Sequence, residues 1–212
     1  MAKVKICGLR RPEDIQMVNE ALPDYIGFIF APSKRRLGAQ EASDLAGELK
    51  KQIKKVGVFV NEKPETILKI AGQVGLDVIQ LHGDEGEEDI RFLQERGLEV
   101  WKALRIRSQA EAEQGLLLPA DRLLMDSFVP RLYGGSGKRF DPGLLRGINP
   151  ELLAQKVIVA GGLDLENIAE IMDEIKPYAF DVSSGVETDG WKDGQKVKRF
   201  VQTVKGSAAC QI

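Results

Sequence analysis

The feature that most constrains the fold of this chain is a pattern repeated along its 212 residues, in which short apolar runs alternate with amphipathic segments. Nearly continuous apolar runs rich in Val and Ile are typical of parallel strands buried on both faces. Eight such runs are present, at residues 4–7, 25–30, 55–60, 78–82, 99–104, 122–126, 156–160 and 179–183. Because strands that alternate with helices form parallel sheets with right-handed crossovers, the pattern predicts an α/β fold. Eight units favour closure into a single (β/α)8 TIM barrel, and an open doubly wound sheet is the alternative.

The segments between the runs carry signals for helix starts. Pro12 and Pro64 each stand at the beginning of a segment and are followed by acidic residues, as in the first turn of many helices. Asp164 is a favourable N-cap for a helix over residues 165–175, whose apolar side chains follow helical spacing. The segment 109–117 has the weakest helical pattern, because a glycine interrupts it.

Length and charge limit the class of protein. The chain fits one compact barrel domain over residues 1–206, followed by a C-terminal tail at 207–212 that departs from the pattern. A formal net charge of −2 argues against binding nucleic acid or an anionic membrane through bulk charge. No apolar run reaches the roughly 20 residues that span a bilayer, and the first residues do not resemble a signal peptide. We therefore expect a cytoplasmic protein whose two cysteines, at opposite ends of the chain, form no disulfide.

Small residues follow the last two predicted strands. Gly161 and Gly162 come after the seventh strand, and Ser183, Ser184 and Gly185 come at the end of the eighth. In this type of barrel, active sites lie where the strands end, and the loops after strands seven and eight commonly bind phosphate. Paired small residues let backbone amides approach such a ligand closely. The sequence therefore predicts a phosphate site here, with two tight turns that bind nothing as the alternative.

Two side chains able to exchange protons also stand at predicted strand ends. Cys7 closes the first strand and Asp126 closes the sixth. A thiolate can accept a proton, but a thiol with a pKa near 8.5 is mostly protonated at neutral pH, so a neighbour must favour the anion. Lys5 has the same strand parity as Cys7 and is a candidate for that neighbour. Thiol and carboxyl could serve as base and acid, whereas an inert buried cysteine and a loop-capping aspartate are the plainer interpretations.

Two further segments each have a functional and a plain interpretation. In the cationic run after the second strand, one arginine reaching inward could hold a carboxylate through two hydrogen bonds, and position alone does not choose between Arg35 and Arg36. The segment 133–138 looks superficially like a nucleotide-binding loop, but Leu132 replaces its first glycine and an arginine replaces its Ser or Thr. We interpret this segment as a flap that closes over a ligand.

Seven short motifs, spread over nearly the whole chain, can be compared with known families. They are KICGL at residues 5–9, GFIF at 27–30, VGVFVN at 56–61, QLHG at 80–83, YGGSGK at 133–138, GGL at 161–163 and DVSSGVE at 181–187. In this order they resemble the motifs of the phosphoribosylanthranilate isomerase family of tryptophan biosynthesis. The first, fourth and last motifs are the most specific, whereas a paired glycine alone would not be.

The resemblance implies an Amadori rearrangement of N-(5-phosphoribosyl)anthranilate to 1-(2-carboxyphenylamino)-1-deoxyribulose 5-phosphate. It makes Cys7 the general base, Asp126 the general acid and an arginine after the second strand the anchor for the anthranilate carboxylate. Motif spacing assigns that anchor to Arg36, with the adjacent Arg35 as the alternative. The expected substrate-binding residues are Arg36, His82, Gly161, Gly162, Asp181, Ser183, Ser184 and Gly185.

Other functions are open at this point. A different phosphate-binding barrel enzyme, such as an indole-glycerol-phosphate synthase or a Schiff-base aldolase, would use Lys102 of the fifth strand as its candidate lysine. A catalytically silent sensor of a phosphorylated ligand is a third possibility. No nucleotide or metal motif is present, so we expect a cofactor-free enzyme without a metal site. Its expected partner is a small phosphorylated substrate, and a monomer or a homodimer would fit equally well.

Overall fold

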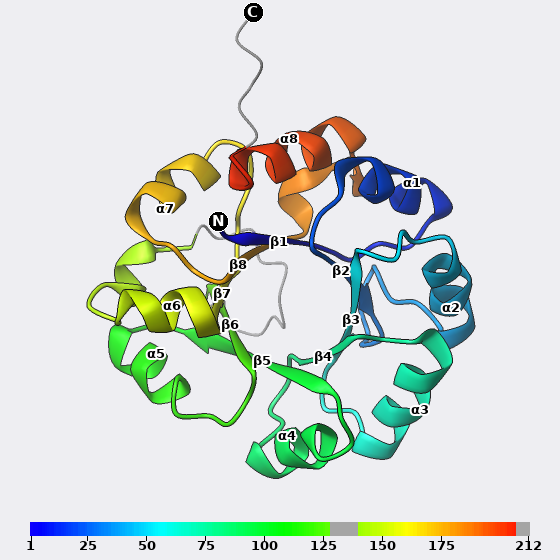
Figure 1. Cartoon of the computed structure of the whole chain (residues 1–212), viewed down its shortest axis with the longest axis horizontal. Coiled ribbons are helices and arrows are strands. Elements are labelled where there is room, and N and C mark those ends of the chain that lie inside the picture. The colour runs from blue at the N-terminus through cyan, green and yellow to red at the C-terminus, as the bar shows by residue number, and fades with distance from the viewer. Residues whose placement is uncertain (128–139, 207–212) are drawn as a thin grey trace, which may run out of the picture.

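The computed structural model describes residues 1–127 and 140–206. Eight parallel strands pair in chain order and the last pairs with the first, so the sheet closes into a barrel (Figure 1). The strands are β1 (Lys3–Cys7), β2 (Tyr25–Ile29), β3 (Lys54–Phe59), β4 (Val78–Leu81), β5 (Glu99–Ile106), β6 (Arg122–Ser127), β7 (Val157–Val159) and β8 (Ala179–Val182). The predicted (β/α)8 barrel is confirmed, and the open sheet is wrong.

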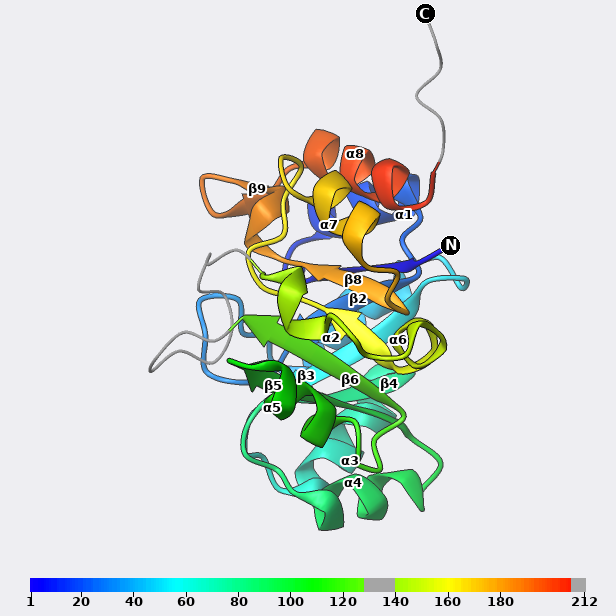
Figure 2. The same ribbon diagram turned by 90° about the vertical axis from the view of Figure 1, so that its left-hand side faces the viewer.

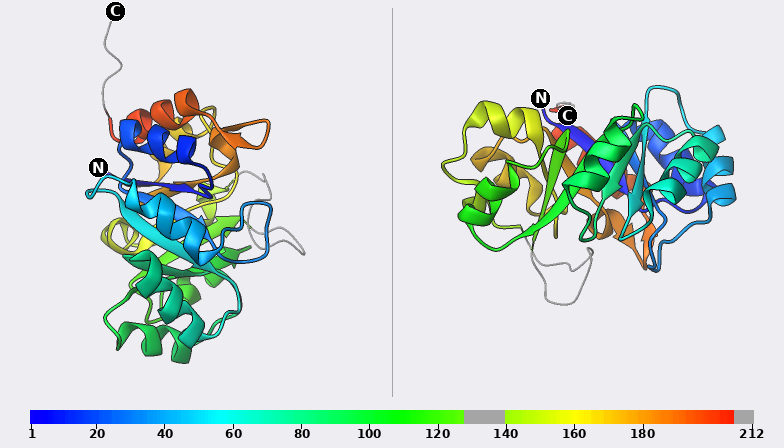
Figure 3. Two further views of the ribbon diagram at one scale, coloured as in Figure 1. Left: turned by 90° about the vertical axis from the view of Figure 1, so that its right-hand side faces the viewer. Right: turned by 90° about the horizontal axis from the view of Figure 1, so that it is seen from below.

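The helices form a ring around the barrel (Figure 1). They are α1 (Pro12–Ala21), α2 (Ala39–Gly47), α3 (Pro64–Val74), α4 (Glu87–Gln94), α5 (Gln109–Gly115), α6 (Pro150–Lys156), α7 (Ile168–Glu174) and α8 (Gly194–Val204), with short 3-10 helices η1 (Pro142–Leu145) and η2 (Ser184–Val186). Between η2 and α8 lies a small antiparallel hairpin of β9 (Glu187–Thr188) and β10 (Trp191–Lys192). Figures 2 and 3 show this hairpin projecting at the end of the barrel where the parallel strands end.

The inside of the barrel changes from apolar to polar along its axis. Near the starts of the strands, Trp101 and Leu124 belong to a small inner cluster, separate from the large cluster between strands and helices. Nearer the strand ends, Lys5 on β1, Gln80 on β4 and Asp126 on β6 are polar, and none of them is more than 5 % exposed. Buried polar groups are costly unless they are paired or used, so this gradient indicates a site at the C-terminal end of the barrel.

The helix boundaries agree with the sequence in part. The starts predicted at the two prolines are confirmed by α1 and α3. The helix predicted over 165–175 instead begins at Ile168, so Asp164 is not its N-cap. The Asp164 carboxylate accepts hydrogen bonds from the amides two and three residues later, at 2.9 and 3.0 Å, and closes a turn that precedes the helix.

The weakly predicted fifth helix is present as α5. Its last residue, Gly115, packs so closely on the Leu104 side chain of β5 that a Cβ would collide there, which explains the glycine. The predicted flap at 133–138 and the predicted tail at 207–212 lie outside the described residues. Within the described part of the chain, no helix is long and apolar enough to cross a membrane.

Candidate active site

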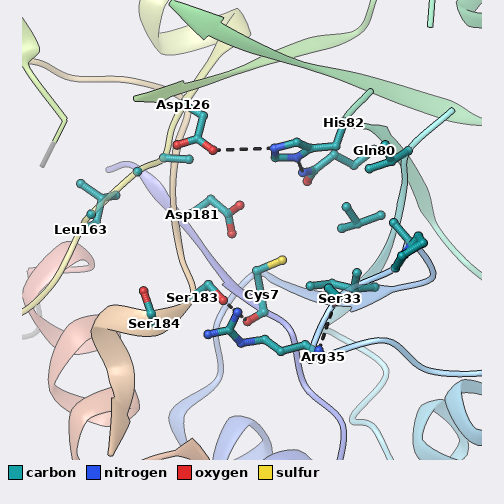
Figure 4. Close-up of a pocket in the computed structure, with 18 of the residues that line it drawn as sticks. Cys7, Ser33, Arg35, Gln80, His82, Asp126, Leu163, Asp181, Ser183 and Ser184 are labelled. Carbon is teal, nitrogen blue, oxygen red and sulfur yellow. Dashed lines mark hydrogen bonds and ion pairs between the residues drawn. The ribbon is translucent and has the colours of Figure 1, made fainter. Parts of the chain in front are cut away.

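A cavity of about 410 Å³ opens where the barrel strands end (Figure 4). Most of the predicted site residues line it, from loops and strands that are far apart in the sequence. These are Cys7, His82, Asp126, Gly161, Gly162, Asp181, Ser183 and Ser184. Of the remaining two, Gly185 lies next to the lining and Arg36 lies outside it, whereas the alternative Arg35 is part of the lining.

Cys7 ends β1 and is nearly buried in the cavity wall. Gly27 of β2 makes room for it, because a Cβ at this glycine would stand 2.7 Å from the Cys7 sulfur. Burial raises the pKa of the Cys7 thiol, the positive charge of Lys5 works against that rise, and the carboxylate of Asp181 adds to it. The net pKa of Cys7 is raised, so the cavity without a ligand holds a neutral thiol at neutral pH.

Beneath Cys7, Lys5 and Asp181 form a buried ion pair. They are register partners on β1 and β8, and Lys5 Nζ lies 2.9 Å from Asp181 Oδ2. Burial lowers the pKa of Lys5, but attraction to Asp181 and to Cys7 outweighs it, so the net pKa of Lys5 is raised and the ammonium stays charged. Asp181 Oδ1 is buried and accepts no hydrogen bond from any described residue. The cavity therefore contains a free acceptor at its base.

Asp126 and His82 approach each other from β6 and from the end of β4 (Figure 4). His82 Nε2 lies 3.7 Å from Asp126 Oδ2, which is longer than a normal hydrogen bond. The amide nitrogen of Gln80 lies 2.8 Å from His82 Nδ1. Because an amide nitrogen only donates, this amide orientation makes Nδ1 the acceptor and leaves the ring proton on Nε2, toward Asp126. Sequence reasoning missed Gln80, although it shares strand parity with His82.

The turns after β7 and β8 bring backbone amides to the cavity wall. Gly162 has a φ of +57°, a left-handed conformation that favours glycine. The amides of Gly161 and Gly162 donate to no described residue. Gly185 packs against the backbone of Leu163 and Asp164 without room for a Cβ, so the two turns touch each other. This arrangement offers donors for an anion at the shared edge of the two loops.

The two adjacent arginines after β2 have different surroundings. Arg35 donates to both carboxylate oxygens of Glu187, at 2.8 and 2.7 Å. Arg36 is exposed, and its guanidinium pairs with no described residue. Lys102, the candidate Schiff-base lysine, is buried outside the cavity lining, where its Nζ donates to Glu85 at 2.8 Å and to the Gly83 carbonyl at 2.6 Å.

A thiol and a carboxyl line one cavity, beside a turn whose Gly161 and Gly162 amides donate to no described residue. These features define a class of protein: a barrel enzyme for acid–base chemistry on an anionic small molecule. The model of the N-(5'phosphoribosyl)anthranilate (PRA) isomerase family matches residues 4–203, and the chain belongs to this family. The predicted isomerase class and its place in tryptophan biosynthesis are thereby confirmed.

Individual relatives agree with this assignment. The N-(5'-phosphoribosyl)anthranilate isomerase of Thermoanaerobacter pseudethanolicus is 47% identical over 206 residues, covering 97% of this chain and 99% of the relative. The solved phosphoribosyl anthranilate isomerase of Thermotoga maritima is 37% identical with a TM-score of 0.86, covering 97% of this chain and 100% of the other. A further isomerase structure, 36% identical with a TM-score of 0.83 and the same coverage, contains reduced 1-(o-carboxyphenylamino)-1-deoxyribulose 5-phosphate.

Proposed function

We propose that this chain catalyses the Amadori rearrangement of N-(5-phosphoribosyl)anthranilate with Asp126 as general acid and Cys7 as general base. The observation that carries the proposal is that both side chains line one cavity from different strands. A proton donor and a proton acceptor on separate walls can act on different atoms of one bound substrate. The family to which the chain belongs supplies the reaction.

In the first step, Asp126 gives its proton to the furanose ring oxygen. The bond from that oxygen to C1 breaks, and the nitrogen lone pair forms the C1–N double bond of a protonated Schiff base. Asp126 is 5 % exposed and lines the cavity, so its carboxyl group can contact a bound substrate. His82 approaches Asp126 through Nε2, which favours one orientation of the carboxyl group.

Before the second step, the Cys7 thiol gives its proton to solvent, and the resulting thiolate takes the proton from C2. The electrons of the C–H bond form the C1–C2 double bond of an enolamine, and the iminium nitrogen becomes neutral. The enolamine then becomes the ketone by moving a proton from the C2 hydroxyl to C1. The ammonium of Lys5 supports a transient thiolate, because its charge lowers the pKa of Cys7.

The two anionic groups of the substrate call for two anchors. The free amides of Gly161 and Gly162, together with the turn at Ser183 and Ser184, suit the phosphate. For the anthranilate carboxylate we propose Arg36. The bidentate face of Arg35 is already occupied by Glu187, whereas Arg36 is exposed and its guanidinium pairs with no residue that the structure describes.

No observation favours an aldolase mechanism in which a lysine of the protein forms a Schiff base with the substrate. Lys102 is held by Glu85 and by the Gly83 carbonyl, away from the cavity lining. The cofactor-free, cytoplasmic enzyme expected from the sequence, and its state as monomer or homodimer, stay predictions.

The direct test is turnover of N-(5-phosphoribosyl)anthranilate by the purified chain, followed by the loss of anthranilate fluorescence. We expect saturable turnover without added metal or cofactor. An inactive but folded protein that still binds inorganic phosphate would contradict the proposed reaction and favour a silent sensor. Borohydride trapping with substrate gives the second readout, and a covalent adduct would favour the aldolase type.

A further inference from the structure

A cluster of charged side chains borders the cavity wall that carries Cys7, and its member Arg35 also lines the cavity. It joins Arg35, on the loop after β2, to Glu187 and Lys192 of the β9–β10 hairpin. Glu187 Oε1 accepts a hydrogen bond from Lys192 Nζ at 2.8 Å, while Arg35 donates to both Glu187 oxygens. The side chains of Glu187 and Lys192 are only 7 % and 1 % exposed. Withdrawing charges from water is costly, and apolar side chains would hold a hairpin as well.

The cluster is connected to the backbone of the proposed base, through Ser183, and to that of the residue after it. Lys192 Nζ donates to the Ser183 carbonyl at 2.9 Å, and the Ser183 hydroxyl donates to the Cys7 carbonyl at 3.1 Å. The aliphatic part of Arg35 packs on the next residue, Gly8, where a Cβ would stand only 2.6 Å from the Arg35 Cδ. The loops after β1, β2 and β8 therefore meet at this cluster.

The same hairpin is fastened to the loop after β1 from outside. Trp191 lies between two guanidinium groups, those of Arg10 at 3.8 Å and Arg11 at 4.1 Å from the ring centroid. Arg10 also donates to the Gly190 carbonyl at 2.8 Å and to the Lys34 carbonyl at 2.8 Å. These contacts hold Glu187 and Lys192 in place relative to Cys7.

The charged groups on the Cys7 side of the cavity do not cancel. From its own strand it faces Lys5, from β8 Asp181, from β10 Lys192 and from the loop after β2 Arg35. Across the cavity stand Asp126 and His82. Asp181 matches Lys5 one to one, whereas Lys192 and Arg35 share the single carboxylate of Glu187.

The hairpin cluster thus contributes one net positive charge beside the base. The charge of Lys192 lowers the pKa of the Cys7 thiol, and a Cys7 thiolate in turn raises the pKa of Lys192. Burial lowers the pKa of Lys192 most, and the hydrogen bond and charge of Glu187 oppose that change only in part, so the net pKa of Lys192 is lowered.

We infer that Lys192 is a positioning residue for the base: held by Glu187, it fixes the loop end at Cys7 and supplies the positive charge that favours the thiolate. The inference rests on the proposed role of Cys7 in the isomerase reaction. Its test reads the chemistry of the thiol directly, so it does not depend on turnover.

The experiment measures the rate at which iodoacetamide alkylates Cys7 between pH 6 and 10, by mass spectrometry, in a Cys210→Ser background. Lys192→Met removes the charge and keeps the length of the side chain. We expect its alkylation at neutral pH to slow by about tenfold and its pH midpoint to rise by about one unit. Lys192→Arg restores the charge and should return the profile close to that of the parent.

Lys196→Met is the matched control. Lys196 Nζ donates to the backbone carbonyl of Glu187 at 2.8 Å, so this variant removes a part-buried contact of the same hairpin without touching the carboxylate. Its alkylation profile should stay within about twofold of the parent. An unchanged profile in a folded Lys192→Met protein overturns the inference, and so does an equal shift in Lys196→Met.

Glu187→Gln keeps the test decisive if Lys192→Met does not fold. Removing the negative charge makes the surroundings of Cys7 more positive, so alkylation should become faster and its midpoint should fall. Slower or unchanged alkylation in folded Glu187→Gln overturns the inference. A separate measurement tests the proposed function itself. Full turnover by Cys7→Ser would contradict the role of Cys7 as base, whatever the alkylation rates are.

Discussion

Both ends of the barrel contain polar side chains that are buried or partly buried. The two ends differ in whether the polar atoms of these side chains have hydrogen-bond partners. At the mouth, where the strands end, Gln80 Oε1, His82 Nε2 and Asp181 Oδ1 are buried and have no hydrogen-bond partner among the described residues. At the floor, where the strands begin, Tyr25 and Tyr178 share a hydrogen bond of 2.6 Å. An unpaired buried polar atom costs stability, whereas a paired one costs little.

Most of the polar side chains at the floor are paired with one another. Lys3 donates to the Tyr178 hydroxyl at 2.9 Å, and the Arg122 guanidinium lies 4.3 Å from the centroid of the Tyr178 ring. Trp101 packs its ring against the edge of Tyr25 with centroids 4.9 Å apart. One further unpaired atom, Arg122 Nε, lies here.

The difference separates two uses of polarity in one barrel. Open acceptors and donors at the mouth are available to a ligand, and the paired side chains at the floor contribute to stability. In barrels of this type the two ends commonly divide activity and stability in this way. The comparison therefore predicts that substitutions at the mouth change activity more than stability and that those at the floor do the reverse.

The largest effect is expected for Asp126→Asn. The amide keeps the shape and polarity of the side chain but cannot deliver a proton, so turnover should be lost almost completely. The defect falls on the chemical step, so affinity for the reduced product analogue should be largely retained. Steady-state turnover and titration of the analogue measure the two quantities. An active variant with a lower melting temperature would mean that Asp126 only caps its loop.

Cys7→Ser is expected to be nearly as severe. A hydroxyl is a much weaker proton acceptor than a thiolate, and general-base catalysis contributes about 10²–10⁴-fold. Turnover should fall within that range while the circular dichroism spectrum stays unchanged. Cys210→Ser is the control and should retain full activity. A loss smaller than about tenfold would remove Cys7 from the role of base.

These mouth residues were within reach of the sequence because each ends an apolar run. A barrel brings all strand ends to one side, so Cys7 and Asp126 could be placed together without knowing any contact. Gln80 was missed because it is a single polar residue inside an apolar run. Such a residue becomes a candidate for the site only when its side chain is known to face the inside of the barrel. Gln80 and His82 are two residues apart, so their side chains point to the same face and can form a hydrogen bond. Nothing in the sequence singles out this pair from other pairs with the same spacing.

The hairpin cluster was beyond the sequence for a different reason. Arg35 and Glu187 are 152 residues apart, and nothing local in either segment predicts that they pair. The predicted helix start at Asp164 was wrong for a local reason. An aspartate closes a turn with the same hydrogen bonds that cap a helix, so the sequence does not distinguish the two. Two kinds of feature could therefore not be predicted from one sequence: ion pairs between segments far apart in the chain, and the choice between a turn and a helix cap.

Arg36→Met tests the carboxylate anchor at the rim. Loss of a hydrogen-bonded charge pair costs about 1.5–3 kcal/mol, so KM should rise by roughly 10–100-fold with kcat little changed. Arg35→Met should instead lower the melting temperature, because it breaks the ion pair with Glu187. Steady-state kinetics of both variants decide the assignment. If only Arg35→Met raises KM, the anchor is Arg35.

The smallest effect on activity is expected at the floor, for Tyr178→Phe. The variant loses the hydrogen bonds with Tyr25 and Lys3, so the free energy of unfolding should fall by about 1 kcal/mol with turnover unchanged. A drop in turnover comparable to that of the mouth variants would contradict the division between the two ends. Urea unfolding and fluorescence-detected turnover provide the two measurements.

The same pair of tyrosines gives the floor a pH dependence. Burial raises the pKa of Tyr178, but hydrogen bonds with Lys3, Tyr25 and Arg122 outweigh it, so the net pKa is lowered. The pKa of Tyr25 is raised, by burial first and then by its bond to Tyr178. An unfolded tyrosine titrates near pH 10. Just below that pH, the unfolded chain therefore binds more protons at Tyr178 than the folded chain does, and stability rises with pH.

Above about pH 10 the sign reverses, because the folded protein keeps the Tyr25 proton that the unfolded chain has lost. The contribution of the pair to stability should thus peak near the ordinary tyrosine pKa. In Tyr178→Phe the rising part disappears, since no group with a lowered pKa remains in the pair. Urea unfolding of both proteins at pH 8, 9 and 10 gives the difference directly. Parallel stability profiles would show that the two phenols titrate independently, and the floor would then be a set of separate contacts.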